Sequence, residues 1–361
     1  MEARHDERVG LMKEWHRPFP LDEEFILMTF GFNLASRRHR IGLFGLLALS
    51  VVSIALLRRI GESEEATMAS NFNVPTPTLG GTQFWTDHHI QSGHRIQQHA
   101  ITRHWRWLDE RRIRRAWGSR VDVEEAFAKG VPQAEPPQHV IVLLHGLMRT
   151  SHSMESLQAE LSSIIDAEVV RFGYSSTRQT LAESAEALRD VLDHYPSSTR
   201  FSFIGHSMGN IIVRRCVGDL ERDPDGQSLL SRCNAMVMLG PPNQGAAIAR
   251  RMSKTGVFGW VAGPAAMELG PNWDEIVETL AIPPFPFAIV AGDRTDAALQ
   301  NPLVDGPSDF VVSVDEARLD GATEVQRVDV LHSFLMDDAD IRSWTVSWLL
   351  EHGCQRRSSG T

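Results

Sequence analysis

From residue 139 onward, short apolar runs alternate with segments whose apolar residues recur at helical spacing. The apolar runs predict strands at residues 139–144, 167–172, 200–204, 234–239, 287–291 and 324–330, and a short extended run at 310–314. The helical spacing predicts helices at residues 154–163, 180–194, 244–252 and 338–352, and a further one containing residues 211–213. Strands that alternate with helices predict an α/β fold with a mostly parallel sheet covered by helices on both faces.

The first part of the chain lacks this alternation. Residues 1–36 mix charges of both signs with aromatic residues and predict a tail with little fixed structure. The uncharged run 41–57 has arginines on both sides and predicts a transmembrane anchor at 37–60; because no cleavage pattern follows it, an anchor is favoured over a cleaved signal peptide. More arginines precede the run than follow it, so the bulk of the chain, which follows the run, is expected on the extracytoplasmic side. Residues 61–82 predict a polar linker.

Residues 83–138 predict a small β-rich extension of the main sheet. Alternation at 95–98 and 103–108, with a turn-like Ser92-Gly93, indicates short antiparallel strands added to the sheet edge. A short helix is predicted at residues 122–130, and a linker at 132–137 leads into a main domain at 139–361. The extension contains several histidines, which are expected to face solvent: His88, His89, His94, His99 and His104. None of them pairs at ligand spacing with an acidic partner on one helix face, so no metal site is expected.

Composition narrows the classes of function. The chain has 361 residues and a net charge of -10, which gives no electrostatic support for a nucleic-acid partner. The arginines between residues 103 and 120 predict a solvated face, with contact to phosphate or anionic lipid as the alternative. The 3 cysteines are widely spaced and indicate neither a disulfide framework nor a zinc site.

The candidate chemistry begins at the sequence Gly205-His206-Ser207-Met208-Gly209, between a predicted strand and a predicted helix. This order is typical of a nucleophile elbow, which holds a serine hydroxyl exposed at a sharp turn. A side chain at either glycine would collide with the adjoining strand or helix. Ser207 is therefore the candidate nucleophile, and the alternative is that its hydroxyl only caps the helix.

A second element follows the strand predicted at residues 139–144. His145-Gly146-Leu147-Met148 places a glycine where the backbone must turn. An oxyanion hole needs two preset donors, and the amides of Leu147 and Met208 would supply them. The alternative is a plain turn at the end of a strand.

A serine hydroxyl needs a base, and the base in turn needs an acid. His332 lies between the last predicted strand and the last predicted helix, where the Ser-acid-His chain order places a general base. The rival base is His206, whose side chain would leave the turn beside the nucleophile. Asp309 is the first candidate for the acid, and Asp296 is the alternative because it follows a core strand directly.

Six pieces of the chain occur in the order of one superfamily: HGL, FGYSSTR, GHSMG, MLGPPNQG, SDFVVSVDEARL and LHSF. From about residue 139 the chain resembles the α/β-hydrolase superfamily and, within it, the lipase-like serine esterases with the GPI inositol-deacylase-like group. The resemblance implies Ser207 as nucleophile, Asp309 as acid, His332 as base, and Leu147 and Met208 as oxyanion donors. The chain differs from the family where Phe310 replaces a frequent glycine, and in the long gap between Gly292 and Asp309.

The resemblance also implies residues that border the substrate. His145 and Gly146 in the first turn, and Pro242 and Asn243 in GPPNQG, are expected at the pocket. The apolar segment 255–282 predicts either a cap that binds an acyl chain or an inserted helix pair with ordinary packing.

These features together predict a serine hydrolase that cleaves carboxylic esters through an acyl-enzyme on Ser207, with no metal or organic cofactor. The expected substrate is a small-molecule or lipid ester, and the expected membrane contact is through residues 41–57. Two alternatives use the same sequence features: a membrane-tethered binding protein with a non-catalytic hydrolase fold, and an acyltransferase.

Overall fold

The computed structural model describes residues 82–254, 258–294 and 301–358 of the chain. All of them fall within one compact unit, Pro77–Thr361. The predicted tail and anchor, and the predicted linker apart from Thr82, lie outside the described residues. Within the described ranges, no helix is both long and apolar enough to cross a bilayer.

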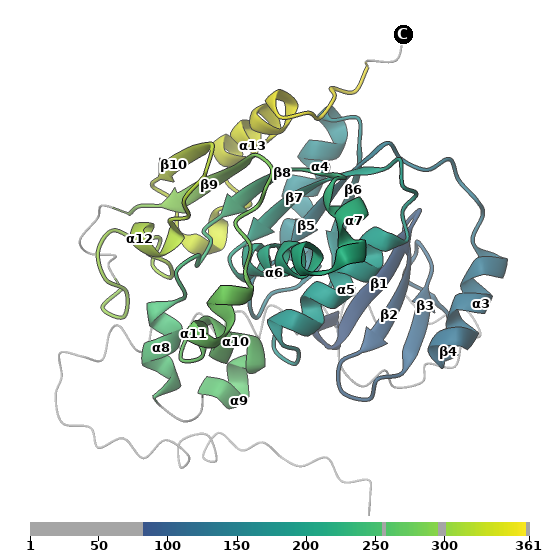
Figure 1. Ribbon diagram of the computed structural model, residues 1–361, viewed down its shortest axis with the longest axis horizontal. Helices are drawn as coiled ribbons and strands as arrows, with labels where there is room; N and C mark the ends of the chain where they lie inside the picture. The colour runs from purple at the N-terminus through teal and green to yellow at the C-terminus, as the bar shows by residue number, and fades with distance from the viewer. Residues whose placement is uncertain (1–81, 255–257, 295–300, 359–361) are drawn as a thin grey trace, which may run out of the picture. The chain divides into compact units, whose positions relative to one another are not determined.

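The larger of two sheets has six strands in the order β10-β9-β8-β7-β5-β6, and all neighbouring pairs are parallel (Figure 1). Its strands are β5 (His139–Leu144), β6 (Glu168–Phe172), β7 (Arg200–His206), β8 (Cys233–Leu239), β9 (Phe287–Gly292) and β10 (Glu324–Val328). Every residue of β5 and of β9 is buried. Such uninterrupted apolar strands are typical of a parallel sheet that is covered on both faces.

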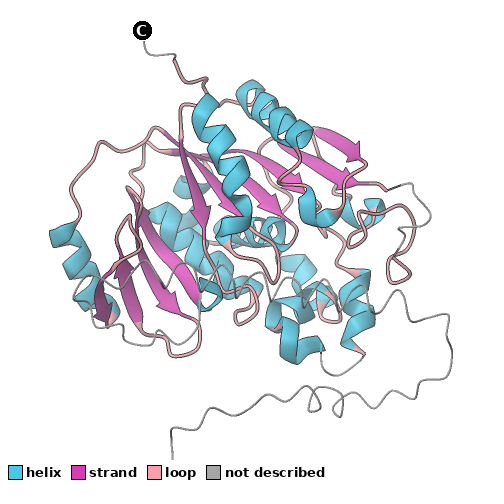
Figure 2. Cartoon of the chain, turned by 180° about the vertical axis from the view of Figure 1, so that it is seen from behind, coloured by secondary structure: helices cyan, strands magenta, loops and turns pink. Residues whose placement is uncertain are grey.

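Helices cover both faces of this sheet (Figure 2). One apolar cluster joins the sheet to α5 (Leu181–Asp193) and α6 (Met208–Arg222), and a second joins its opposite side to α4 (Glu155–Ile164) and α13 (Ala339–Glu351). The remaining helices are α3 (Arg120–Gly130), α7 (Gln227–Leu230), α8 (Ala247–Ser253), α9 (Phe258–Ala262), α10 (Pro264–Leu269), α11 (Trp273–Ile276) and α12 (Val314–Ala317). The predicted α/β class with a parallel sheet is confirmed.

The extended run predicted at residues 310–314 is wrong. These residues form bends that lead into the short helix α12. The Asp309 carboxylate accepts the amides of Val311 at 3.0 Å and Val312 at 2.7 Å, which curls the backbone into a turn. A local side-chain contact has therefore replaced pairing with a neighbouring strand.

The predicted antiparallel strands exist, but the expectation that they extend the main sheet is wrong. They form a separate four-stranded sheet in the order β1-β2-β3-β4. Its strands are β1 (Trp85–Gln91), β2 (His94–His99), β3 (Trp105–Leu108) and β4 (Arg114–Gly118), and all pairs are antiparallel. The helix α3 covers this small sheet, and Val123 and Phe127 of the helix pack against Ile96, Trp105 and Trp107 of the strands.

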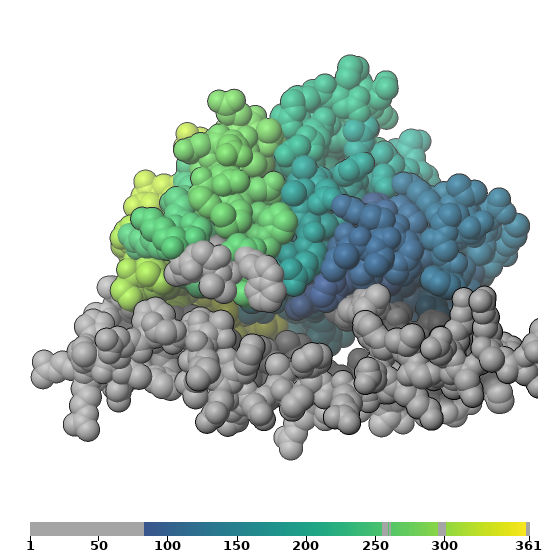
Figure 3. Space-filling view, turned by 90° about the horizontal axis from the view of Figure 1, so that it is seen from below, coloured from purple at the N-terminus to yellow at the C-terminus, as the bar shows by residue number. Residues whose placement is uncertain are grey.

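The small sheet also contacts the larger domain through β1, which packs against α5. His88 Nδ1 lies 2.8 Å from Asp190 Oδ2 of that helix. In the space-filling view the small sheet (blue) lies directly against the teal part of the chain (Figure 3). The expectation that the histidines face solvent is wrong for His88 and His99, which are 8 % and 1 % exposed, because aromatic rings such as Trp85 and Trp105 enclose them.

Between β8 and β9 the chain inserts the short helices α8 to α11. The predicted cap at residues 255–282 contains α9, α10 and α11. Leu269 and Trp273 of this segment are buried in the same cluster as the core of the main domain. Glu268 accepts the Leu181 amide at 2.7 Å, which ties α10 to the start of α5. Ordinary packing therefore accounts for these side chains, while Val261 stays 45 % exposed.

Candidate active site

Ser207 occupies a strained turn between β7 and α6. Its φ of 53° and ψ of -123° lie in a region that residues with side chains rarely adopt. Its amide donates to the Leu239 carbonyl at 2.8 Å, which fixes the turn to the end of β8. The side chain makes no capping hydrogen bond to the helix and is partly exposed. The alternative role as a plain helix cap is therefore not supported.

The glycines around this turn make close approach possible. A Cβ on Gly209 would lie 2.6 Å from the Leu144 carbonyl oxygen, and one on Gly205 would lie 2.7 Å from the Asn210 amide nitrogen. A Cβ on Gly146 would lie 3.1 Å from the Ser207 Cβ. The turn after β5 therefore contacts the Ser207 turn directly.

His332 and Asp309 form a buried pair. His332 Nδ1 lies 2.7 Å from Asp309 Oδ2, and the His332 amide donates to the Asp309 carbonyl at 2.9 Å. The two residues are 7 % and 0 % exposed. Since the other oxygen of the carboxylate accepts two amides from its own turn, the carboxylate is held in one orientation toward the imidazole.

The Asp309 turn includes a residue in a left-handed conformation. Phe310 has a φ of 85°, a backbone conformation that favours glycine. This backbone conformation costs a residue with a side chain roughly 1–2 kcal/mol. The Asn301 side chain donates to the Phe310 carbonyl at 2.7 Å and helps to hold the turn. The positive φ at Phe310 is therefore held by a contact from Asn301 as well as by the Asp309 turn.

Two further glycines make room for the pair. The backbone of Gly292, the last residue of β9, approaches Asp309 so closely that a Cβ there would also lie 2.7 Å from the Val330 carbonyl oxygen. Gly240, directly after β8, has a φ of 54°, and a Cβ there would lie 3.0 Å from His332 Nδ1. The pair therefore lies against the ends of β9 and of β8, and β8 is the neighbour of β7.

His206, the rival base, is turned toward His332. Its Nε2 donates to the His332 carbonyl at 2.9 Å, the two ring centroids lie 4.7 Å apart, and its Nδ1 has no protein partner. Burial, and then the neighbouring His332, hold the pKa of His206 well below its usual value. A neutral imidazole that holds the His332 backbone is the arrangement these contacts favour.

The turn after β5 is held from the next strand along the sheet. The Met148 amide donates to Ser176 Oγ at 3.1 Å, and Tyr174, just beyond β6, donates its hydroxyl to the His145 carbonyl. Met208 is the first residue of α6, and amides in the first turn of a helix have no acceptor within the helix. Leu147 and Met208 thus belong to two backbone turns that meet at Ser207.

The four residues predicted to border the substrate are all buried. The His145 side chain is fully buried and stacks on Tyr174 with centroids 4.0 Å apart. The Asn243 side chain is 2 % exposed, accepts from Arg214 at 3.1 Å and donates to the Ala317 carbonyl at 2.9 Å. Pro242 and Gly146 are also buried, and a Cβ on Gly146 would lie 3.1 Å from the Ser207 Cβ.

Three side chains that contact or belong to the turn after β5 were not predicted as site residues: Tyr174, Ser176 and Arg149. Tyr174 and Ser176 belong to FGYSSTR, and their place directly after a core strand was the signal available. Arg149 donates to the Ser333 carbonyl at 3.2 Å and links the turn after β5 to the segment of His332.

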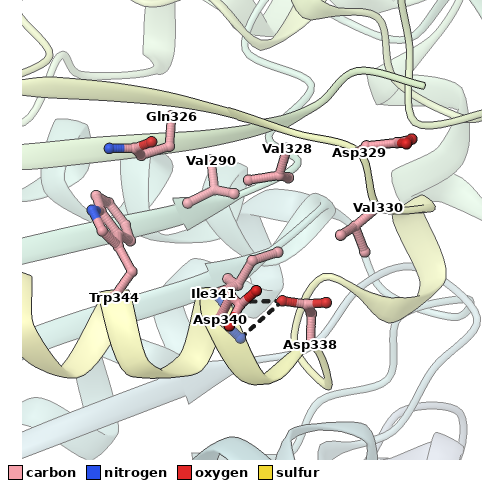
Figure 4. Close-up of a pocket in the computed structure, with 9 residues that line it drawn as sticks. All are labelled: Val290, Gln326, Val328, Asp329, Val330, Asp338, Asp340, Ile341 and Trp344. Atoms are coloured by element: carbon pink, nitrogen blue, oxygen red, sulfur yellow. Dashed lines mark hydrogen bonds between the residues drawn. The ribbon is translucent and has the colours of Figure 1, made fainter. Parts of the chain in front are cut away.

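Asp296 lies outside the described residues. Among the described residues, no group of three or more His, Cys, Asp or Glu side chains could hold a metal ion. A cavity of about 440 Å³ between β10 and α13 is lined by Trp344, Asp338 and Asp329 among others, and its lining does not include Ser207, Asp309 or His332 (Figure 4).

The parallel sheet, the strained serine after a central strand and the buried His-Asp pair are the arrangement typical of an α/β-hydrolase-like fold. Residues 134–239 match the family described as "Putative serine esterase (DUF676)". The match confirms the resemblance to the lipase-like serine esterases; it spans HGL and GHSMG and ends before Asp309 and His332.

Comparison with solved structures finds enzymes of similar description at low identity. A lipase of Bacillus licheniformis, BlEst2 in its mature form, is 16% identical with a TM-score of 0.45, over 61% of this chain and 96% of that one. The metagenomic carboxyl esterase MGS0156 is 18% identical with a TM-score of 0.43, over 62% of this chain and 77% of that one. No curated protein matches the chain significantly.

Proposed function

We propose that this protein is a serine hydrolase that cleaves carboxylic esters through an acyl-enzyme on Ser207. The observation that carries the proposal is the combination of the strained, partly exposed Ser207 with the buried Asp309-His332 pair, whose nearest atoms are 2.7 Å apart. Strained residues cluster at functional sites, and the Ser207 side chain makes no capping hydrogen bond to α6 that would give it a structural role there.

The proposed reaction has two steps. His332 takes the proton of the Ser207 hydroxyl as the oxygen attacks the ester carbonyl, and the protonated imidazole then gives that proton to the leaving alcohol. In the second step a water attacks the acyl-enzyme in the same way and releases the carboxylic acid. Asp309 holds the imidazole tautomer and stabilises its charged form, and the amides of Leu147 and Met208 donate to the developing oxyanion.

The replacement Ser207→Ala tests the proposal. The variant is expected to lose at least about 10⁴-fold in kcat on a short acyl ester, since removal of a triad nucleophile has effects of this order or larger. A fluorophosphonate probe is expected to label the native protein and not the variant. Ser333→Ala, an exposed serine next to His332, is the matched control and should keep both activity and labelling. Esterase activity retained by Ser207→Ala would refute the mechanism, and a native protein that takes up no probe would favour the non-catalytic binding protein.

The membrane contact and the substrate class are part of the same proposal. We propose that residues 41–57 anchor the protein, that the hydrolase domain lies on the extracytoplasmic side, and that the substrate is a small-molecule or lipid ester. The uncharged run and its flanking arginines support the anchor. Protease treatment of intact membranes should digest the hydrolase domain, and protection of that domain would contradict the orientation. A panel of esters with graded acyl length would define the substrate.

A further inference from the structure

We propose that Asp87 on β1 positions the turn that carries the Leu147 amide. Through this residue the small four-stranded sheet takes part in catalysis. The inference rests on the proposed function and assigns Asp87 as a positioning residue that never touches substrate. A continuous set of contacts supports it, from Asp87 to residues 173–176 and from there to residues 145–148.

The first link joins Asp87 to Gly173, the residue after β6. The Asp87 amide donates to the Gly173 carbonyl at 2.8 Å, and Asp87 Oδ2 accepts the Gly173 amide at 2.7 Å. One fully buried residue thus holds both backbone groups of Gly173. Gln97 donates to Asp87 Oδ1 at 2.7 Å, and Arg95 pairs with the carboxylate, so its charge is balanced inside the protein.

Neighbours of Asp87 hold the next residues in the same way. Thr86 Oγ1 accepts the Ser175 amide at 3.1 Å, and the Ser175 hydroxyl donates to the Gln83 carbonyl at 2.7 Å. The Thr86 hydroxyl in turn donates to Gln179. The segment after β6 therefore takes its position from the small sheet as well as from its own strand.

The second link joins this segment to the turn after β5. The Tyr174 hydroxyl donates to the His145 carbonyl, its ring stacks on the His145 ring at an angle of 6°, and Ser176 Oγ accepts the Met148 amide at 3.1 Å. Burial raises the pKa of Tyr174 well above its usual value, so the hydroxyl stays protonated and remains a donor. Leu147 lies between the two residues that are held, so its amide direction depends on both.

Not every contact of β1 belongs to this path. His88, the residue after Asp87, has its Nδ1 2.8 Å from Asp190 Oδ2 and links the same strand to α5. Asp190 is therefore a matched control for docking alone. A purely structural role of the small sheet predicts equal effects at Asp87 and Asp190, while positioning of the oxyanion turn predicts an effect at Asp87 only.

The test measures kcat and KM separately, together with the rate of labelling by a fluorophosphonate. Asp87→Asn keeps the shape of the side chain and removes its charge, and is expected to lower kcat and the labelling rate about tenfold with KM within about twofold. Oxyanion donors act in the transition state, and loss of one whole donor costs about 10²–10³-fold, so misplacement of one costs less. Tyr174→Phe keeps the stacked ring, removes the hydroxyl, and is expected to have a similar effect.

Asp87 and Tyr174 act in series on the same turn. The double variant Asp87→Asn with Tyr174→Phe should therefore lose less kcat than the product of the two single losses. Asp190→Asn should keep kcat within about twofold. If Asp87→Asn does not fold, Thr86→Val tests the same link with an expected loss of about threefold, and normal kcat in that variant would overturn the proposal. Native kcat in Asp87→Asn, or an equal loss in Asp190→Asn, would also overturn it. These outcomes differ from failure of the proposed function, which would appear as activity in Ser207→Ala.

Discussion

The two sheets of this protein are held in place by different interactions. Strands β5 and β9 of the parallel sheet bury apolar side chains against helices on both faces. The small antiparallel sheet has a much smaller apolar core and buries a polar network instead, in which Arg106 donates to Gln97 at 2.7 Å and Gln97 donates to Asp87. Apolar burial is not directional, whereas hydrogen bonds fix positions. The large sheet thus supplies stability and the proposed reacting groups, and the small sheet supplies precise placement.

The largest effect on kcat is expected at Asp309, the proposed acid, which lies against the end of β9 in the large sheet. Asp309→Asn should lower kcat about 10⁴-fold, as loss of the acid of a triad does elsewhere, because the imidazole loses its tautomer control. Asp296→Asn should keep kcat within about threefold. Steady-state kinetics on one ester would compare the two, and equal activity of both variants would leave neither aspartate as the acid.

Substitutions in the apolar core of the large sheet and in the polar network of the small sheet should lower the free energy of unfolding by different amounts. Phe203→Ala in β7 removes a side chain that is 1 % exposed and should lower the free energy of unfolding by about 3–5 kcal/mol. Gln97→Met in β2 leaves the partners Asp87 and Arg106 short of a hydrogen bond and should cost about 1–3 kcal/mol. Urea denaturation would measure both. Equal losses would remove the distinction between the two sheets.

Each sheet also has a histidine that should weaken the protein in acid. Burial, and then Arg200, lower the pKa of His139 in β5 to about 4; burial, and then His194, lower that of His89 in β1 to about 3. The unfolded chain binds protons near the ordinary histidine pKa of 6.5, so stability is lost as the pH falls from about 6.5 toward the folded pKa. The loss is at most about 1.4 kcal/mol per pH unit for each group.

His139→Gln and His89→Gln should therefore each flatten the dependence of unfolding free energy on pH between about 6.5 and 4. Urea denaturation at several pH values would measure the slope. Slopes identical to that of the native protein would show that neither histidine is held neutral by its sheet.

The smallest effect on stability and activity is expected at Phe310. This residue lies in the Asp309 turn, which hydrogen bonds hold in place, as they do in the small sheet. Phe310→Gly relieves the positive φ but loses a partly buried ring, so the free energy of unfolding should change by less than about 1 kcal/mol and activity should be kept. The β-branched Phe310→Val, as the control, should be clearly less stable and less active. Thermal unfolding and kcat would be measured together, and a Phe310→Gly variant without activity would show that the ring itself is needed.

The main domain could be predicted from the sequence because its signals are local. The six residues of His139–Leu144 are all apolar apart from the first, and Ser207 lies between two glycines that only a tight turn requires. The buried contact of His332 with Asp309 agrees with the chain order of the superfamily, although residues 23 positions apart had to meet.

The remaining features depend on partners far along the chain. The partner of Asp87 is a backbone amide 86 residues away, so no local pattern shows that β1 docks on the end of β6 rather than pairing with the main sheet. The burial of His88 and His99 depends likewise on rings that other strands bring in. The apolar pattern at residues 310–314 predicts an extended run, but the structure has a turn. The Asp309 carboxylate accepts hydrogen bonds from the amides of the residues that follow it, and these contacts fold the backbone there.

The contact between Asp87 and Gly173 also has a consequence for synthesis on the ribosome. Strand β1 leaves the ribosome 86 residues before the glycine that completes its hydrogen bonds, a delay of several seconds at ordinary elongation rates. During that interval Arg95 and Gln97 are the partners of the carboxylate nearest in sequence. Pairing of β1 with β2 brings both partners to the carboxylate, so its charge can be balanced within the nascent hairpin before Gly173 emerges.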